Sequence, residues 1–344
     1  MIDKHIRRAD LVGKTIDIHS HVGIQERVAA QIGFPYCSSV EDLAYRQKAN
    51  GVDAGVVFPT GPALYFDLPE FVESGRLTRA ARPISKAPYE RENRLVLTDV
   101  FRFCPEHSAR FLPFVSVNPG REVKQQIAVL RELEQEFPIY GIKIAPIACQ
   151  SKVTELLGPG ESFFKFFAER NWPILFHVAV SQGEEFSQAA DTFRVIQRHP
   201  ELRYCLAHCI GLHHAFLERA DALPNVWVDT SALKIQVELA FQDSPLMAFP
   251  PERFACDLSD HVKVMQALVA RFPETIIWGT DSPYHSYITR RLQGEGVYAE
   301  FRLKGTYEQE KAALDALTDA QRLQNNANAL EFLFGRREDA TEPK

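Results

Sequence analysis

Eight short apolar runs alternate with helical segments along the chain, and this alternation restricts the possible folds more than any other feature. The runs are four to seven residues long and span 15–21, 53–58, 111–117, 140–144, 173–177, 203–208, 226–229 and 275–278. Strands that alternate with helices indicate a parallel sheet, because each parallel connection needs a crossover segment. Eight such units in 344 residues favour a closed (β/α)8 TIM barrel over an open sheet.

The segments between the runs have the apolar spacing of amphipathic helices, most clearly in VKQQIAVLRELEQEF at 123–137. Further helices are expected from 38–42 onward and over 92–107, 162–170, 192–198, 215–222, 261–271, 308–317 and 320–334. No G-x-G-x-x-G follows the first run, which argues against a dinucleotide-binding fold. We expect one barrel domain over residues 1–344, with long loops after the second and seventh strands.

The first run, TIDIHSH, ends on two histidines two positions apart. Alternate residues of a strand face the same side, so His19 and His21 can direct both imidazoles to one point while Ser20 faces away. Neutral imidazole is the commonest metal ligand in proteins. Taken alone, this motif leaves a metal site and a chance pair of surface or core histidines as equal alternatives.

Several of the other apolar runs change from apolar to polar residues near their carboxyl ends, as the first run does. Lys143 lies on the fourth predicted strand, His177 ends the fifth, His208 ends the sixth and Asp281 follows the eighth. In a (β/α)8 barrel the chemistry sits at the carboxyl ends of the strands. One polar strand end is ordinary, but five histidine or aspartate residues at four strand ends indicate a shared site.

These motifs resemble the amidohydrolase superfamily, in its branch of aminocarboxymuconate semialdehyde decarboxylase-like enzymes. The matching stretches are IDIHSH, GIKIAP, LFH, LAHCIG, PNVWVDTS, WGTDSPY and the closing NANALEFLFG, which together run from about residue 15 to 335. The resemblance implies one divalent metal ion, with zinc expected, bound by His19, His21, His177 and Asp281. It also implies that His208 is a catalytic histidine outside the main ligand set.

The chemistry of these residue types agrees with that set. Three imidazoles and a carboxylate suit zinc and leave room for a water molecule, whose pKa the metal lowers. Asp281 can take the proton of that water, and His208 can hydrogen-bond the substrate oxygen as negative charge develops. We therefore expect a metal-dependent hydrolase that cleaves a C–N or C–O bond of a small organic substrate.

Three alternatives stay open. A non-oxidative decarboxylase, a carboxy-lyase, fits the same scaffold but needs a cation for the leaving carboxylate, and the sequence identifies no arginine for it. A barrel that binds a ligand without catalysis would have lost a metal ligand, and none is lost here. In other branches of the superfamily a lysine at the place of Lys143 is carboxylated and bridges two metals; GIKIAP resembles the single-metal branch, and the plainer alternative is a buried lysine paired with a carboxylate.

Charge and cysteine usage restrict the partners and the compartment. The net charge is −6 and there is no basic run, so nucleic acid and membrane are not expected as partners, whereas a homo-oligomer stays open. No apolar stretch reaches the about 18 residues of a membrane helix, and the first residues lack a secretory core. Six cysteines without a C-x-x-C pair indicate a reducing, cytoplasmic setting. Cys205 and Cys209, on either side of His208, are metal ligands or, as is more usual, buried thiols.

The remaining histidines and several loop residues carry weaker signals. His5, His107, His199, His213 and His214 are expected at the surface, while His285 follows Asp281 closely enough to touch a substrate. Some residues fall in loops on the expected active face, where they either indicate an unsaturated or carboxylate-bearing substrate or simply pack the loops; they are Tyr65, Phe66, Tyr284 and Arg290.

Overall fold

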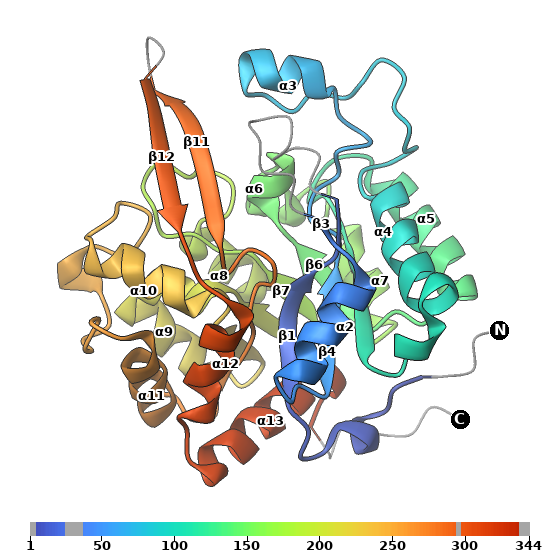
Figure 1. The fold of residues 1–344 in the computed structure, drawn as a ribbon. Coiled ribbons are helices and arrows are strands. Elements are labelled where there is room, and N and C mark those ends of the chain that lie inside the picture. Colours follow the sequence, from blue (N-terminus) through green and yellow to red (C-terminus); the bar gives the residue numbers. More distant parts are fainter. Residues whose placement is uncertain (1–4, 25–36, 294–296, 337–344) are drawn as a thin grey trace.

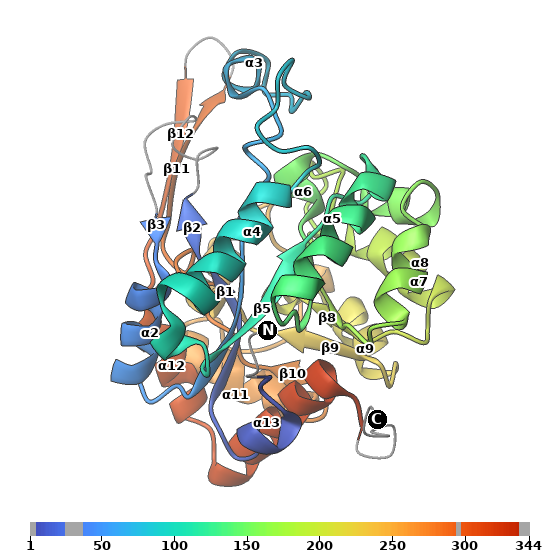
Figure 2. The same ribbon diagram turned by 90° about the vertical axis from the view of Figure 1, so that its right-hand side faces the viewer.

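The barrel strands follow one another in chain order around a parallel sheet (Figures 1 and 2). The computed structural model describes residues 5–24, 37–293 and 297–336. Each predicted strand is present, with bounds within two residues of the prediction. The eight strands are β1 (Ile16–His21), β4 (Ala54–Phe58), β5 (Phe111–Ser116), β6 (Gly141–Ile144), β7 (Ile174–Phe176), β8 (Tyr204–Leu206), β9 (Val226–Asp229) and β10 (Ile276–Ile277).

Backbone hydrogen bonds between β1 and the segment around β10 close the sheet into a barrel. Ile18 N donates to Trp278 O over 3.4 Å. Beyond the end of β10, Asp281 N donates to His19 O over 2.8 Å, and His21 N donates to Ser282 O over 2.7 Å. The predicted (β/α)8 TIM barrel is therefore confirmed.

Helices surround the barrel, and local capping explains where several of them begin. Ser39 caps the first by accepting a hydrogen bond from Asp42 N, and Thr306 and Thr318 start the last two through capping boxes. The helices are α2 (Val40–Ala49), α3 (Leu68–Ser74), α4 (Glu90–Thr98), α5 (Val123–Glu136), α6 (Pro146–Cys149), α7 (Ser162–Ala168), α8 (Ala189–Arg198), α9 (His214–Asp221), α10 (Leu233–Phe241), α11 (His261–Arg271), α12 (Tyr307–Asp315) and α13 (Asp319–Phe334).

The amino-terminal end of the barrel is filled by apolar side chains and covered by α13, which lies below the strands in Figure 1. Phe332 of α13 contacts Phe114 of β5 and Trp227 of β9, with ring centroids 6.2 and 6.1 Å apart. Leu330 and Leu333 join the same interior cluster. Because this end is closed, the opposite end, where the strands finish, is the open end for a site.

Besides the short helices α3 and α6, which were not expected, three parts of the fold differ from the sequence-based prediction. Helix α10 lies in the connection after the seventh barrel strand, where no helix was expected; its first N–H groups, of Leu233 and Lys234, donate to the carboxylate of Glu310 on α12 rather than to a local cap. The predicted helix at 92–107 divides into α4, a π-helical turn (Asp99–Phe103) and a 3-10 turn (Pro105–His107).

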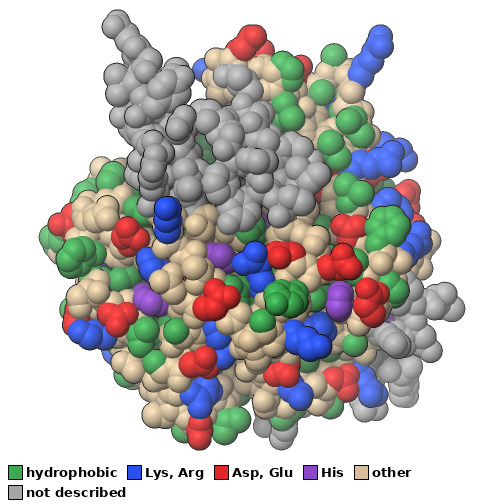
Figure 3. Space-filling view, viewed as in Figure 1, with side chains coloured by type: hydrophobic (Ala, Val, Ile, Leu, Met, Phe, Trp, Pro, Cys, Tyr) green, Lys and Arg blue, Asp and Glu red, His purple; other side chains and the backbone are tan. Residues whose placement is uncertain are grey.

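The third difference is a hairpin of β11 (Tyr287–Gln293) and β12 (Val297–Leu303), which projects from the open end of the barrel, as does the segment with α3 (Figures 1 and 2). A second short pair, β2 (Gly23–Ile24) and β3 (Cys37–Ser38), also follows β1. Acidic and basic side chains are interspersed on the face shown in Figure 3. None of the described helices is both long enough and apolar enough to span a membrane.

Gly141 at the start of β6 offers a test of the barrel packing. A Cβ atom at this position would lie 2.5 Å from Cζ of the buried Phe114 ring. We expect Gly141→Ala to lower the free energy of unfolding by about 1–3 kcal/mol, the usual cost of overfilling a packed core, as measured by urea denaturation. Gly183→Ala is the control, because its Cβ would meet nothing within 4 Å. Equal stability of the two variants would contradict this packing.

Candidate active site

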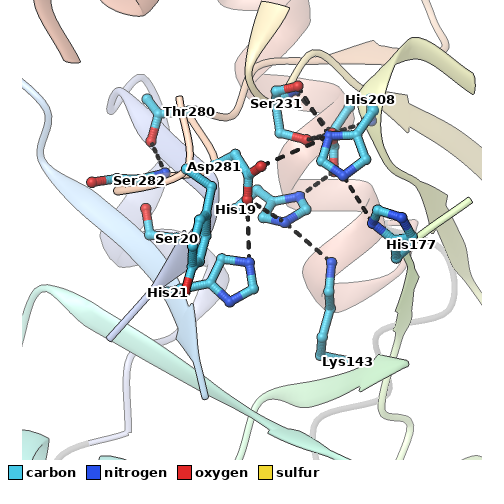
Figure 4. Close-up of polar contacts among 12 residues, drawn as sticks. His19, Ser20, His21, Lys143, His177, His208, Ser231, Thr280, Asp281 and Ser282 are labelled. Atoms are coloured by element: carbon cyan, nitrogen blue, oxygen red, sulfur yellow. Dashed lines mark hydrogen bonds and ion pairs between the residues drawn. The ribbon is translucent and has the colours of Figure 1, made fainter. Parts of the chain in front are cut away.

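Three of the predicted metal ligands lie together at the open end of the barrel (Figure 4). The Nε2 atoms of His19 and His21 each lie 3.2 Å from Oδ1 of Asp281. One ligand atom from each residue lies within 4.8 Å of the others, and all three residues are buried. The histidines belong to β1 and Asp281 follows β10, so the cluster forms where the first and last barrel strands meet.

A β-bulge in β1 turns both histidines toward the interior. The register of β1 against β4 shifts between Asp17 and Ser20. Ile18 belongs to the interior apolar cluster, so in a regular strand the next residue, His19, would face outward. The bulge instead places Ile18, His19 and His21 on the inner side. Simple alternation therefore predicts the pairing of the two histidines correctly but misses the irregularity that aims them.

Asp281 is held in a conformation that a non-glycine residue seldom adopts. Its φ angle is +58°, in the left-handed region. Burial acts to raise the pKa of Asp281, but attraction to His19 and hydrogen bonds from His19 and His21 lower this pKa well below its usual range. The carboxylate is therefore ionised at neutral pH and offers negative oxygens to the two imidazoles.

Asp229, at the end of β9, fixes the orientation of His19. Its Oδ2 lies 2.9 Å from Nδ1 of His19, while Oδ1 accepts hydrogen bonds from the backbone N–H groups of His208 and Ser231. Burial acts to raise the pKa of Asp229, yet the charge and hydrogen bond of His19 outweigh it, so the pKa falls below the usual range. An ionised Asp229 accepts the Nδ1 proton of His19, which directs the Nε2 atom of His19 toward the cluster.

Lys143 on β6 also reaches the cluster. Its Nζ lies 3.1 Å from Nε2 of His19 and 4.7 Å from the ring centroid of Phe58. Burial lowers the pKa of Lys143 to about 8, although Asp229 and Asp281 oppose this shift. Among the residues that the structure describes, Lys143 is not paired with a carboxylate, and its hydrogen-bond partner is the imidazole of His19.

His177 and His208 form a second pair beside the cluster. Nδ1 of His177 lies 3.0 Å from Nε2 of His208, and Nδ1 of His208 lies 3.0 Å from the hydroxyl of Ser231. His208 Nδ1 is also 4.0 Å from Oδ2 of Asp281. Burial is the main cause that lowers the pKa of both histidines, so both are neutral at pH 7. The structure thus places His208 at the edge of the cluster and turns His177 toward His208 rather than into the group of three.

The residues present fit a divalent cation. Nε2 of His19 and Nε2 of His21 each lie 3.2 Å from the same ionised oxygen of Asp281, so two imidazole nitrogens and a carboxylate oxygen meet at one point, where either protons on the rings or a divalent cation can lie between them. Nδ1 of His21 is buried and has no hydrogen-bond partner among the described residues. Imidazole nitrogen and carboxylate oxygen are the donors that zinc prefers besides thiolate.

The weaker sequence signals have mixed outcomes. Tyr65 and Phe66 are buried in a small cluster with Phe71, Leu77 and Tyr89, so they pack the loop. The Tyr284 ring meets that of His21 edge-on, with centroids 5.1 Å apart. His285 is 4% exposed and packs near the Tyr307 ring. The side chain of Arg290 lies outside the described residues.

The five histidines that were expected at the surface are all partly or fully exposed; they are His5, His107, His199, His213 and His214. Cys205 and Cys209 are buried free thiols that pack in the apolar core. Neither belongs to the group of possible metal ligands found among the described residues. Sequence reasoning missed the roles of Asp17, Asp229, Ser231 and Thr280. A signal existed for Asp229, since the run VWVD ends on it just as other runs end on their polar residue.

A (β/α)8 barrel with two histidines and an aspartate gathered at the carboxyl ends of its strands is the arrangement of a barrel enzyme with a possible metal site. Comparison with known families gives the same answer, because the family model described as Amidohydrolase matches residues 16–327. The chain therefore belongs to the amidohydrolase family, which confirms the resemblance seen in its motifs. No curated protein sequence matches the chain significantly.

Solved structures share the fold at low sequence identity. An amidohydrolase from Burkholderia multivorans with bound HEPES is 14% identical, with a TM-score of 0.57 over 93% of this chain and 98% of that one. A probable 2-pyrone-4,6-dicarboxylic acid hydrolase from Acinetobacter baumannii with citric acid bound is 14% identical, with a TM-score of 0.54 over 94% and 100%. The apo IDCase of Metarhizium anisopliae is 13% identical, with a TM-score of 0.53 over 93% and 97%.

Asp229→Asn tests whether the carboxylate on β9 orients a metal ligand. The amide keeps the size of the side chain but no longer attracts the Nδ1 proton of His19. We expect the affinity for zinc to fall by about 10- to 100-fold, the usual effect of losing such a partner, as measured by competition with a chelator. Asp53→Asn, at the exposed start of the second barrel strand, should bind zinc as the wild type does. Unchanged affinity in Asp229→Asn would exclude this role.

Proposed function

We propose that the protein is a metal-dependent hydrolase that acts on a C–N or C–O bond of a small organic substrate. The observation that carries this proposal is the convergence of His19, His21 and Asp281, with His208 beside the free oxygen of Asp281. His19, His21, His177 and Asp281 would hold one divalent ion, with zinc expected. When bound, such an ion supplies Lewis acidity, which acidifies water and polarises a carbonyl oxygen.

The residues of the chain divide the proton transfers between them. Asp281 is ionised, and its Oδ2, which points toward His208, is free to accept the proton of the attacking water. His208 is neutral, and its Nδ1 donates to Ser231, because the Ser231 hydroxyl itself donates to Asp229 and the Ser231 carbonyl oxygen can only accept. Nε2 of His208 therefore carries the lone pair and lies 3.0 Å from Nδ1 of His177. In this proposal His208 takes up at Nε2 the proton that Asp281 has accepted from the water, and the protonated ring hydrogen-bonds the substrate oxygen while negative charge develops there.

A carboxy-lyase is the second candidate, and Lys143 is the observation that favours it. A decarboxylase needs a cation to hold the leaving carboxylate, and Lys143 places an ammonium group against the cluster without a carboxylate partner in the described part of the chain. The same lysine, if carboxylated, would instead support a two-metal hydrolase. Metal analysis separates the one-metal hydrolase from the two-metal hydrolase, because a single ion per chain is expected for the main proposal and two ions for a carboxylated Lys143.

His208→Asn tests the division between metal binding and catalysis. We expect this variant to keep one metal ion per chain and to lose activity by about 100-fold or more, the scale of one acid–base or oxyanion partner. His19→Ala is the matched comparison and should purify folded but poor in metal. The measurements are metal content and turnover of a substrate found by screening lactones, amides and aromatic acids. Loss of the metal from His208→Asn would make His208 a ligand.

Turnover in oxygen-18 water tests the reaction type. A hydrolase incorporates solvent oxygen into its product, whereas a decarboxylase releases carbon dioxide and takes only a proton from solvent. We expect one labelled oxygen atom per turnover, detected by mass spectrometry. Product without the label, together with evolved carbon dioxide, would replace the hydrolase by the carboxy-lyase and leave the proposed metal site in place.

A further inference from the structure

Asp17 on β1 is fully buried, and its carboxylate accepts five hydrogen bonds. Burial acts to raise the pKa of Asp17, and the hydrogen bonds oppose that rise. Burying a carboxylate is costly unless its oxygens are satisfied. The donors are His19 N (3.1 Å) and Thr280 N (3.0 Å) to Oδ1, and Ser20 Oγ (2.8 Å), Thr280 Oγ1 (2.7 Å) and Tyr307 OH (3.0 Å) to Oδ2.

Two of these hydrogen bonds span the bulge of β1. Residues three apart in a regular strand face opposite sides, so the bond from Ser20 Oγ to Asp17 exists only because the strand is bulged. The backbone N–H of His19 donates to the Asp17 carboxylate at the same place. Asp17 therefore stabilises the irregularity that turns His19 and His21 inward.

Two others fix the turn that carries Asp281. Thr280 donates both its backbone N–H and its hydroxyl to Asp17, and the same hydroxyl accepts a hydrogen bond from Ser282 N over 3.1 Å. The residues on either side of Asp281, Thr280 and Ser282, are thus joined through the Thr280 hydroxyl, which in turn donates a hydrogen bond to Asp17. A left-handed non-glycine residue such as Asp281 persists only where its surroundings fix it.

We propose that Asp17 is a positioning residue of the metal site. Its carboxylate holds the bulge that aims His19 and His21 and the turn that aims Asp281, so it sets the distance between ligands on the two sides of the barrel closure. Asp17 acts through backbone groups and through Thr280, on the outer side of β1 from the ligand atoms. This inference rests on the proposed function, because it concerns the affinity of that site for its metal.

Asp17→Asn is the direct test, since the amide preserves size but directs an NH2 group at hydrogen-bond donors. We expect the affinity of the metal-free protein for zinc and cobalt(II) to fall by about 10- to 100-fold, as for other groups that orient ligands. The visible absorption spectrum of bound cobalt(II) should also change, because it reports the ligand geometry, which a loss of stability alone would leave as it is. Asp53→Asn is the control: it removes a carboxylate from the opposite end of the β1–β4 pair, where Asp53 accepts from Thr15 N.

Thr280→Val and Thr280→Ser provide the test if Asp17→Asn does not fold. Valine keeps the shape and removes the hydroxyl, whereas serine restores it, so weaker metal binding is expected in the first variant and recovery in the second. Folded Asp17→Asn or Thr280→Val protein with the affinity and cobalt spectrum of the wild type would overturn the role of Asp17 and leave the proposed function intact. A wild type that binds neither ion would overturn the proposed metal site and this inference together.

Discussion

The site depends on how the barrel closes between its first and last strands. Strand β10 has only two residues, and three backbone hydrogen bonds join its segment to β1. The ligand atoms lie on both sides of this closure, with His19 and His21 on one side and Asp281 on the other. Their separation is therefore a property of the closed barrel rather than of any single element. Few backbone hydrogen bonds connect the short β10 segment to β1, and the side-chain hydrogen bonds to Asp17 add to this connection.

Charge explains why the cluster suits a cation. Two ionised carboxylates, Asp229 and Asp281, lie on opposite nitrogens of the His19 ring. Burial and the charge of Lys143 act to lower the pKa of His19, but Asp229 and Asp281 outweigh them, so this pKa lies above its usual value. A buried imidazole between two carboxylates draws a positive charge, either a proton or a metal ion. Because a metal ion would satisfy these groups only in the folded barrel, metal binding and stability are linked.

The sequence was sufficient for the features that repeat or that depend on neighbouring residues. Apolar alternation predicted all eight barrel strands, and strand-end polarity singled out the three residues that cluster in the structure, with His208 beside them. The proposed role of Asp17 could not be predicted, since two of its partners, Thr280 and Tyr307, lie more than 260 residues away in the chain. Helix α10 was missed for the same reason: its cap comes from another helix.

Helix α12 links these distant supports. Tyr307 and Glu310 are one helical turn apart and so project from the same face. Tyr307 donates to Asp17 behind β1, while Glu310 accepts from the first N–H groups of α10, directly after the Ser231 segment that orients His208. One helix outside the barrel thus braces both the strand of the two proposed histidine ligands and the segment that orients His208. A shift of α12 would therefore disturb the two halves of the site together, although α12 contributes no residue to the group of ligands.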